Sequence, residues 1–253
     1  MDDKITLATT KNEYSDNAVV ESYAKAVDEI GLWQSEKIIL EKYISINSNI
    51  LDIGCGAGRT TFGLSKIGYA NLTGFDLSEK MINACKMRAM TESVNIEFIS
   101  GNACEMPFVS QIFDAIIFSF NGLMTIPTKV MRAAAFTEIS RVLKSGGIFI
   151  FTTHDMKNER FLEYWKEEKI NWHKGEQDKR LHEYGDLIFI EQKSNDNIEA
   201  FVHVPEYAEI IEETAKARLE IIHSVVRSKL CEENETTQKD SCDCIFWVCR
   251  RLI

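Results

Sequence analysis

Seven residues, Asp52-Ile-Gly-Cys-Gly-Ala-Gly58, have the spacing in this chain that most clearly predicts chemistry. They begin within the apolar run Ile50–Ile53 and precede a segment with helical periodicity, so they form a turn between a strand and a helix. Glycines at such a turn let the backbone bend sharply and approach a bound nucleotide closely. The motif therefore predicts a nucleotide-type ligand at the end of this strand.

A second acidic residue supports this interpretation. Asp76 lies 18 residues after Gly58, at the end of the next predicted strand, Leu72–Phe75. A carboxylate at that position can accept hydrogen bonds from both hydroxyls of a ribose. The glycine turn and Asp76 together predict a ligand that contains a ribose.

The glycine spacing distinguishes this site from a dinucleotide site. Dinucleotide-binding enzymes space their glycines as GxGxxG, which seats a pyrophosphate on the helix N-terminus. Here the spacing is GxGxG, Arg59 follows, and Asp52 precedes the first glycine by two residues. A carboxylate there would repel a pyrophosphate but would suit a ligand with an amino group and a positive sulfonium.

The chain resembles class I S-adenosylmethionine-dependent methyltransferases, including those of ubiquinone and menaquinone biosynthesis and other small-molecule methyltransferases. Ile50–Gly58 resembles their first motif and Asp76 their ribose acid, and three later segments match an adenine-contacting turn, a fourth strand and the turn before a fifth strand: Gly101–Ala103, Phe113–Ser119 and Arg141–Gly147. The resemblance covers roughly Ile50 to Asp155.

Two residues depart from the family pattern. Ser145 replaces the usual proline of the Arg-Val-Leu-Lys-Pro-Gly-Gly turn, and Asn102 replaces the commonest aspartate at the adenine turn. An asparagine still offers a carbonyl oxygen to the adenine amino group, so the contact can survive.

The resemblance implies S-adenosylmethionine as the cofactor and S-adenosylhomocysteine as its product. Glycines 54 and 56 would contact its methionine part, and the N-terminal tyrosines would fold over it. Met81, Phe118 and Tyr23 have core packing as an equally good alternative. The full predicted set comprises Asp52, Gly54, Cys55, Gly56, Gly58, Arg59, Asp76, Leu77, Met81, Asn102, Ala103, Phe118, Ser119, Tyr14 and Tyr23.

Two residues past strand ends are the predicted catalytic residues. His154 follows the fifth strand and could act as a base near neutral pH, or orient the substrate or cap a turn. Asn121 follows the fourth strand and could hydrogen-bond the acceptor. The segment Ser119–Gly122 lacks the Asn-Pro-Pro-Tyr pattern of enzymes that methylate flipped DNA bases, and no Pro-Cys nucleophile is present. We therefore expect a small-molecule acceptor.

Two other functions stay open at this stage. One is a methyltransferase acting on RNA or protein, which an exposed basic groove would favour. The other is a NAD-binding or non-catalytic nucleotide-binding protein, which tight NAD binding without S-adenosylmethionine binding would favour.

Composition and charge limit the expected partners and cellular location of the protein. The net charge is −10 and the pI about 5.1, which disfavours a nucleic-acid partner because such proteins usually present a basic face. No apolar run approaches the roughly 20 residues of a membrane span, and Met1-Asp-Asp-Lys4 lacks the features of a signal peptide. We expect a cytoplasmic monomer or homodimer with no membrane contact.

Seven cysteines suggest free, largely buried thiols in a reducing compartment. Cys242, Cys244 and Cys249 follow a strand-like alternation, and their C-x-C spacing suits structural zinc poorly. The expectation is that no metal is bound.

The order of elements predicts an α/β fold with a doubly wound, mostly parallel, seven-stranded sheet, since apolar runs alternate with amphipathic helices after residue 49. The charged, aromatic-rich region after the fifth strand predicts a helix and a small antiparallel pair. We expect a single domain built from an N-terminal helical cap, a cofactor-binding core, an insertion and a C-terminal part that completes the sheet: 1–47, 48–155, 156–204 and 205–253.

Local patterns give several boundaries. Gly31 separates two early helices, and Ser78 caps a helix that ends near Met90. Gly146-Gly147 is expected to end the helix before the fifth strand. Glu232–Ser241 is polar and predicted to be a loop between two late strands.

Overall fold

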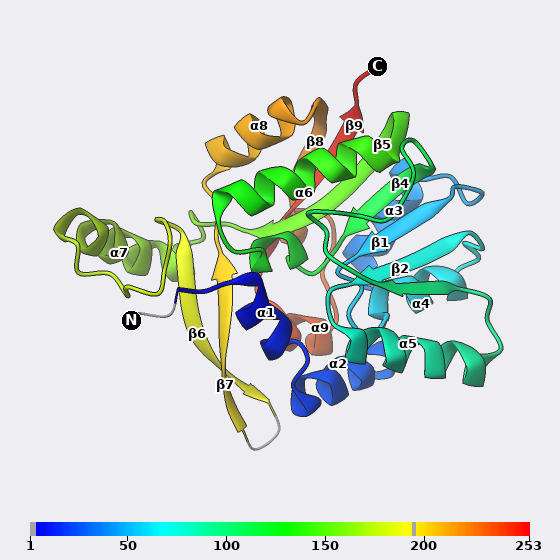
Figure 1. The fold of residues 1–253 in the computed structure, drawn as a ribbon, viewed down its shortest axis with the longest axis horizontal. Coiled ribbons are helices and arrows are strands. Elements are labelled where there is room, and N and C mark those ends of the chain that lie inside the picture. The colour runs from blue at the N-terminus through cyan, green and yellow to red at the C-terminus, as the bar shows by residue number, and fades with distance from the viewer. Residues whose placement is uncertain (1–3, 194–195) are drawn as a thin grey trace.

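A seven-stranded sheet runs through the centre of the computed structural model, which describes residues 4–193 and 196–253 (Figure 1). Its strand order is β3-β2-β1-β4-β5-β9-β8. The first five strands of the chain are parallel, and β9 is antiparallel to both of its neighbours. Their bounds are β1 Ile50–Ile53, β2 Leu72–Asp76, β3 Glu97–Ser100, β4 Phe113–Phe118, β5 Leu143–His154, β8 Leu219–Val226 and β9 Cys244–Arg251. The predicted α/β, mostly parallel architecture is confirmed.

Helices cover both faces of this sheet. One face is covered by α6 (Lys129–Val142) and α8 (Tyr207–Lys216), and the other by α3 (Gln34–Tyr43), α4 (Arg59–Lys66) and α5 (Glu79–Glu92) (Figure 1). Central strands such as β1 are therefore buried on both sides, which explains why they read as continuous apolar runs.

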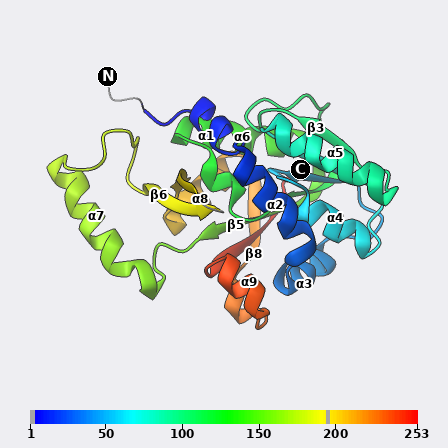
Figure 2. The ribbon, with the colours of Figure 1, turned by 90° about the horizontal axis from the view of Figure 1, so that it is seen from below.

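The N-terminal helices cross the edge of the sheet where the parallel strands end. α1 (Leu7–Glu13) and α2 (Asn17–Glu29) run between the second sheet and α4–α5 (Figure 2). Two bonds tie this segment down: the backbone N–H of Ile5 donates to the Arg180 carbonyl (3.1 Å), and the Thr10 hydroxyl donates to the Thr125 carbonyl (3.3 Å).

The predicted antiparallel insertion is also confirmed. After α7 (Leu162–Lys174), strands β6 (Asp186–Lys193) and β7 (Asp196–His203) pair with each other in a separate two-stranded sheet. Apolar side chains of the insertion pack on η1 (Gly122–Thr125), the short 3-10 helix after β4. The insertion therefore supports the chain that leaves β4.

Two local predictions were wrong, and one helix was not predicted. Glu232–Ser241 contains a helix, α9 (Glu235–Asp240), because the Asn234 side chain caps it by accepting a bond from the Thr237 N–H (2.9 Å). Gly146-Gly147 does not end a helix: α6 stops at Val142, and both glycines lie within β5, where the register against β4 shifts. α1 was missed altogether.

None of the helices within residues 4–193 and 196–253 combines the length and apolar character needed to cross a membrane. All seven cysteines are free thiols, as the sequence suggested.

Candidate functional site

The glycine turn between β1 and α4 is held in a conformation that favours glycine. Gly54, Gly56 and Gly58 have φ values of +61°, +54° and +94°. Side chains here would also collide with rings: a Cβ on Gly54 would lie 2.6 Å from Phe118, and one on Gly58 would lie 2.6 Å from Phe62. Backbone, rather than side chain, therefore forms this wall of the site.

Asp76, at the end of β2, fixes the turn from the adjacent strand. Its Oδ2 accepts a hydrogen bond from the Gly56 N–H and its Oδ1 one from the Ser78 N–H, both 2.8 Å long. Burial raises the pKa of Asp76, and these two backbone bonds oppose that rise. Each carboxylate oxygen has a second lone pair that can accept a further donor.

Asp52 is a second buried acid in the same place. It is 2% exposed, and its Oδ2 accepts a bond from the Thr61 hydroxyl (2.6 Å). Burial raises the pKa of Asp52 to about 7, and the nearby carboxylates of Glu36 and Asp76 act in the same direction. The group therefore titrates near neutral pH, where a bound cation would favour its ionised form.

A buried ion pair anchors α3 to the start of α4. The Arg59 guanidinium makes two bonds to the Glu36 carboxylate, of 2.6 and 2.7 Å, and a third to the Gly31 carbonyl (2.7 Å). Its plane lies over the Trp33 ring, with 4.8 Å between Cζ and the ring centroid. This fixes the base of the N-terminal helices against the glycine turn.

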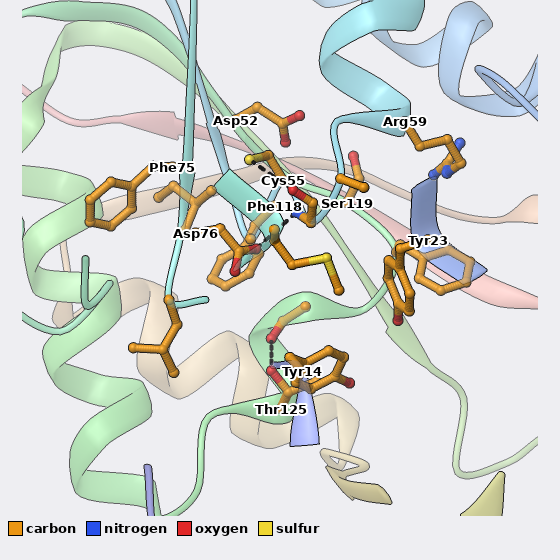
Figure 3. A pocket seen from close by; sticks show the side chains of 18 of the residues that line it. Tyr14, Tyr23, Asp52, Cys55, Arg59, Phe75, Asp76, Phe118, Ser119 and Thr125 are labelled. Carbon is orange, nitrogen blue, oxygen red and sulfur yellow. Dashed lines mark hydrogen bonds between the residues drawn. The ribbon is translucent and has the colours of Figure 1, made fainter. Parts of the chain in front are cut away.

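Gly54, Gly56, Asp52, Asp76 and Arg59 line one cavity of about 220 Å³ at the carboxyl edge of the parallel strands, the place where α/β sheets commonly bind ligands. Figure 3 shows Asp76 and Phe75 on the opposite side of it from Tyr23 and Arg59. Fourteen of the fifteen predicted cofactor residues line it: Asp52, Gly54, Cys55, Gly56, Arg59, Asp76, Leu77, Met81, Asn102, Ala103, Phe118, Ser119, Tyr14 and Tyr23.

The other predicted residues lie outside this lining, judged on the described residues. Gly58 turns the chain behind the cavity, and Asn121 and His154 point toward each other, with 3.5 Å between Asn121 Nδ2 and His154 Nε2. His154 Nδ1 also lies 3.4 Å from the Cys242 sulfur. Burial and the charge of Arg227 lower the pKa of His154 to about 4, so its imidazole is neutral at pH 7.

Sequence reasoning missed much of the cavity. Phe75 and Gly101 immediately precede Asp76 and Asn102, and Phe120 follows Ser119, so their positions beside predicted residues were a usable signal. The contributions of α1, α2 and η1 had no such signal, because their placement depends on long-range contacts: Leu7, Thr10, Ser22, Ala26, Glu29, Ile30, Gly122, Thr125 and Ile126.

The turn that the sequence predicted to contact adenine, Gly101–Ala103, lies in the cavity lining. The Asn102 Oδ1 accepts a hydrogen bond from the Cys104 N–H (2.9 Å), and Asn102 forms an isolated bridge with Glu105. Asn102 and Ala103 thereby present the turn between β3 and β4 to the cavity, next to Asp76.

A second charged cluster joins the insertion to the core. His203 on β7 is 1% exposed; its Nδ1 lies 2.7 Å from Asp186 Oδ1 and its Nε2 lies 3.0 Å from Glu209 Oε2. Arg132 on α6 bridges Glu183 and Glu209 at 2.9 and 3.2 Å. Glu183, Asp186 and His203 are close enough to hold a metal ion, but Arg132 and His203 already pair with these acids. The cluster ties the insertion to α6 and α8, and we call it the clasp.

Comparison with known proteins agrees with the site. Residues 50–147 match the family described as methyltransferase domain. A demethylmenaquinone methyltransferase from Staphylococcus haemolyticus is 31% identical over 121 residues, which are 47% of this chain and 48% of that protein. The chain thus aligns with about half the length of the curated relatives it matches.

Solved structures extend the likeness in fold to most of the chain. A SAM-dependent methyltransferase from Methanosarcina mazei superposes with a TM-score of 0.68 at 23% identity, covering 85% of this chain and 97% of that one. The [4+2]-cyclase SpnF superposes with a TM-score of 0.65 at 14% identity, covering 99% and 98%. Because one fold serves both proteins, the site must decide the chemistry.

Proposed function

We propose that this protein, in which residues 50–147 form a methyltransferase domain of the class I type, transfers a methyl group from S-adenosylmethionine to a small-molecule acceptor. One observation carries the proposal: the glycine turn, Asp76 and the Asn102 turn, which are far apart in sequence, line a single cavity. We further propose that residues 1–253 act as one domain in which cap, core and insertion build one site.

The carboxylates of the cavity fit this cofactor. Asp76 already uses one lone pair on each oxygen for Gly56 and Ser78, and the second pair on each suits the two adjacent hydroxyls of a ribose. Asp52 supplies a carboxylate for a ligand with an ammonium and a sulfonium, both of which favour its ionised form. A pyrophosphate would meet two carboxylates here, so NAD fits poorly.

The bound cofactor would supply an activated methyl group for in-line displacement. The chain's own task is to bind, to align donor and acceptor and to exclude water, and precise alignment accounts for much of the acceleration of such reactions. Asp52, Asp76 and the glycine turn would hold the cofactor, while α1, α2 and η1 would close the cavity. The sequence predicted Asn121 and His154 as catalytic residues; because they contact each other outside the cavity lining, we propose instead that they position this edge of the sheet.

A small acceptor is supported by the shape of the site. Leu7 of α1, Tyr14 just after it and Tyr23 of α2 contribute to the lining. Helices outside the sheet therefore form part of the cavity wall and limit its size, as suits a small ligand. The named activity of the Staphylococcus relative, on demethylmenaquinone, also concerns a small molecule.

Calorimetry tests the cofactor. Wild-type protein is titrated with S-adenosylmethionine, S-adenosylhomocysteine and NAD, alongside Asp76→Ala and the matched control Asp155→Ala, whose carboxylate caps a turn outside the cavity. We expect wild type and the control to bind the first two ligands and the Asp76 variant to lose at least tenfold in affinity, the cost of about 1.4 kcal/mol in hydrogen bonds to a charged group. NAD binding without the others would refute the proposal.

Methyl transfer tests the acceptor class. The protein is incubated with methyl-labelled cofactor and a cell extract separated into small molecules, RNA and protein. Label in the small-molecule fraction is expected, and label confined to RNA or protein would replace the proposed acceptor class.

A further inference from the structure

An aromatic box stands over the glycine turn. Tyr14, Tyr23 and Phe120 all line the cavity. The Tyr23 ring is nearly perpendicular to both of the others, at 88° in each case, with centroids 6.1 Å from Tyr14 and 6.2 Å from Phe120. The three residues come from the segment after α1, from α2 and from the chain after β4, so only the tertiary structure assembles them.

Tyr23 places this box directly on the turn. A Cβ added to Gly56 would lie 3.1 Å from Tyr23 Cδ1, so the ring rests against the backbone of the glycine. The same glycine donates its N–H to Asp76. The box therefore faces the part of the cavity that the two buried carboxylates, Asp52 and Asp76, also line.

An uncommon backbone conformation places Phe120 in the cavity wall. Phe120 and Asn121 are consecutive non-glycine residues with positive φ, +51° and +59°, and such sparsely populated conformations persist where surrounding structure enforces them. Here the Asn121 N–H donates to the Thr152 hydroxyl (2.8 Å). The Phe120 ring also packs against Trp33, at 5.5 Å and 64°, and the Arg59 guanidinium lies over it, with 5.5 Å between Cζ and the ring centroid.

The charge of the cavity favours a cation. Its described lining residues include the acids Asp52, Asp76 and Glu29, whereas Arg59 is neutralised by its two bonds to Glu36. Aromatic faces attract cations through their quadrupole, and boxes of such rings bind onium groups, whose charge is spread over carbon and hydrogen. A neutral thioether receives no such attraction.

We infer that the box of Tyr14, Tyr23 and Phe120 recognises the sulfonium and so makes the site prefer the charged methyl donor over its neutral thioether product. This rests on the proposed function. It assigns to Phe120, absent from the sequence-based site, a role in cofactor discrimination and in product release.

The ratio of two affinities tests this inference. The Kd values of S-adenosylmethionine and S-adenosylhomocysteine are measured for wild type and Phe120→Leu, which keeps a β-carbon and an apolar side chain but removes the ring. We expect the preference for the sulfonium form to fall about five- to thirty-fold, about 1–2 kcal/mol, with the thioether affinity changed little. Phe189→Leu, on β6 and outside the cavity lining, is the matched control and should keep the wild-type ratio.

A second pair of variants keeps the test decisive if Phe120→Leu folds poorly. Tyr23→Phe retains a ring and should retain the ratio, whereas Tyr23→Leu should lose it. Sinefungin, which has an ammonium group in place of the methylsulfonium, should follow S-adenosylmethionine in every variant.

The outcomes separate the two proposals. If wild type binds neither cofactor form, the proposed function itself is refuted. If wild type binds both and the leucine variants leave the ratio unchanged, or weaken both ligands equally, the box contacts the acceptor or only shapes the cavity, and the inference is wrong.

Discussion

Cofactor binding should be linked to the titration of Asp52. The pKa of this carboxyl is raised to about 7, chiefly by burial and further by Glu36. A ligand with positive groups next to it binds the ionised form better. Affinity for S-adenosylmethionine should therefore increase as the pH rises through 7, because the binding-competent fraction of the free protein increases.

The magnitude follows from that pKa. With a pKa of about 7, about one-eleventh of the free protein carries the carboxylate at pH 6 and about ten-elevenths at pH 8. If the cofactor requires the carboxylate, its apparent Kd falls about tenfold between these pH values. At pH 7, binding should release about half a proton per site.

Calorimetry in two buffers of different ionisation enthalpy measures both quantities. Asp52→Asn is the control, since it preserves the shape of the side chain and the bond from Thr61 but cannot ionise. Any pH dependence that remains in this variant comes from the ligand's own amino group and is subtracted from the wild-type profile. Equal pH profiles for wild type and Asp52→Asn, with no difference in proton release, would refute the argument.

Three further predictions concern the scaffold. Glu36→Gln should lower the free energy of unfolding by about 3–5 kcal/mol in urea titrations, because the buried Arg59 guanidinium loses the negative charge of its partner. The exposed control Glu41→Gln should cost under about 1 kcal/mol, and equal losses in the two variants would contradict this prediction. Gly56→Ala should weaken cofactor binding at least about tenfold, because the new side chain would combine a positive φ with contact against Tyr23. Gly146→Ala has a positive φ but open space around it, and it should bind the cofactor normally in the same calorimetric assay. Normal binding by both variants would show that the contact with Tyr23 is harmless. Burial lowers the pKa of His203, but hydrogen bonds to Asp186 and Glu209 outweigh it and raise that pKa overall. The clasp should therefore stabilise the fold fully below about pH 6.5 and lose this contribution as the pH rises through the raised value; thermal unfolding of wild type and His203→Gln from pH 6 to 9 measures it, and a constant difference between them would count against it.

The sequence determined the core of the site because its signals are local. Asp52–Gly58 and its neighbours predict a strand, a tight turn and a helix within one short segment. The positive φ of each glycine is a property of that local turn. Asp76 was predictable because it ends the next strand, and parallel neighbours bring their carboxyl ends to one edge. Fourteen of the fifteen predicted cofactor residues consequently line the cavity.

Elements with weak local signals were the ones predicted poorly. α9 depends on the Asn234 cap within a polar segment, and polar composition alone resembles a loop. The glycines at 146 and 147 looked like a helix end, yet pairing between β4 and β5 draws the chain into the sheet from Leu143 onward. Tertiary hydrogen bonding outweighed the local preference of the residues there.

Only the tertiary structure shows how the side chains that cover the cavity come together. His154 and Asn121 follow strands that end at the right edge, but their side chains turn toward each other and toward Cys242. Tyr14, Tyr23 and Phe120 meet because α1 is held by the insertion, α2 packs on α4 and α5, and Thr152 holds the chain after β4. Contacts between segments so distant in sequence leave no periodicity or spacing to read, so the chain encodes them only through the packing of the whole fold.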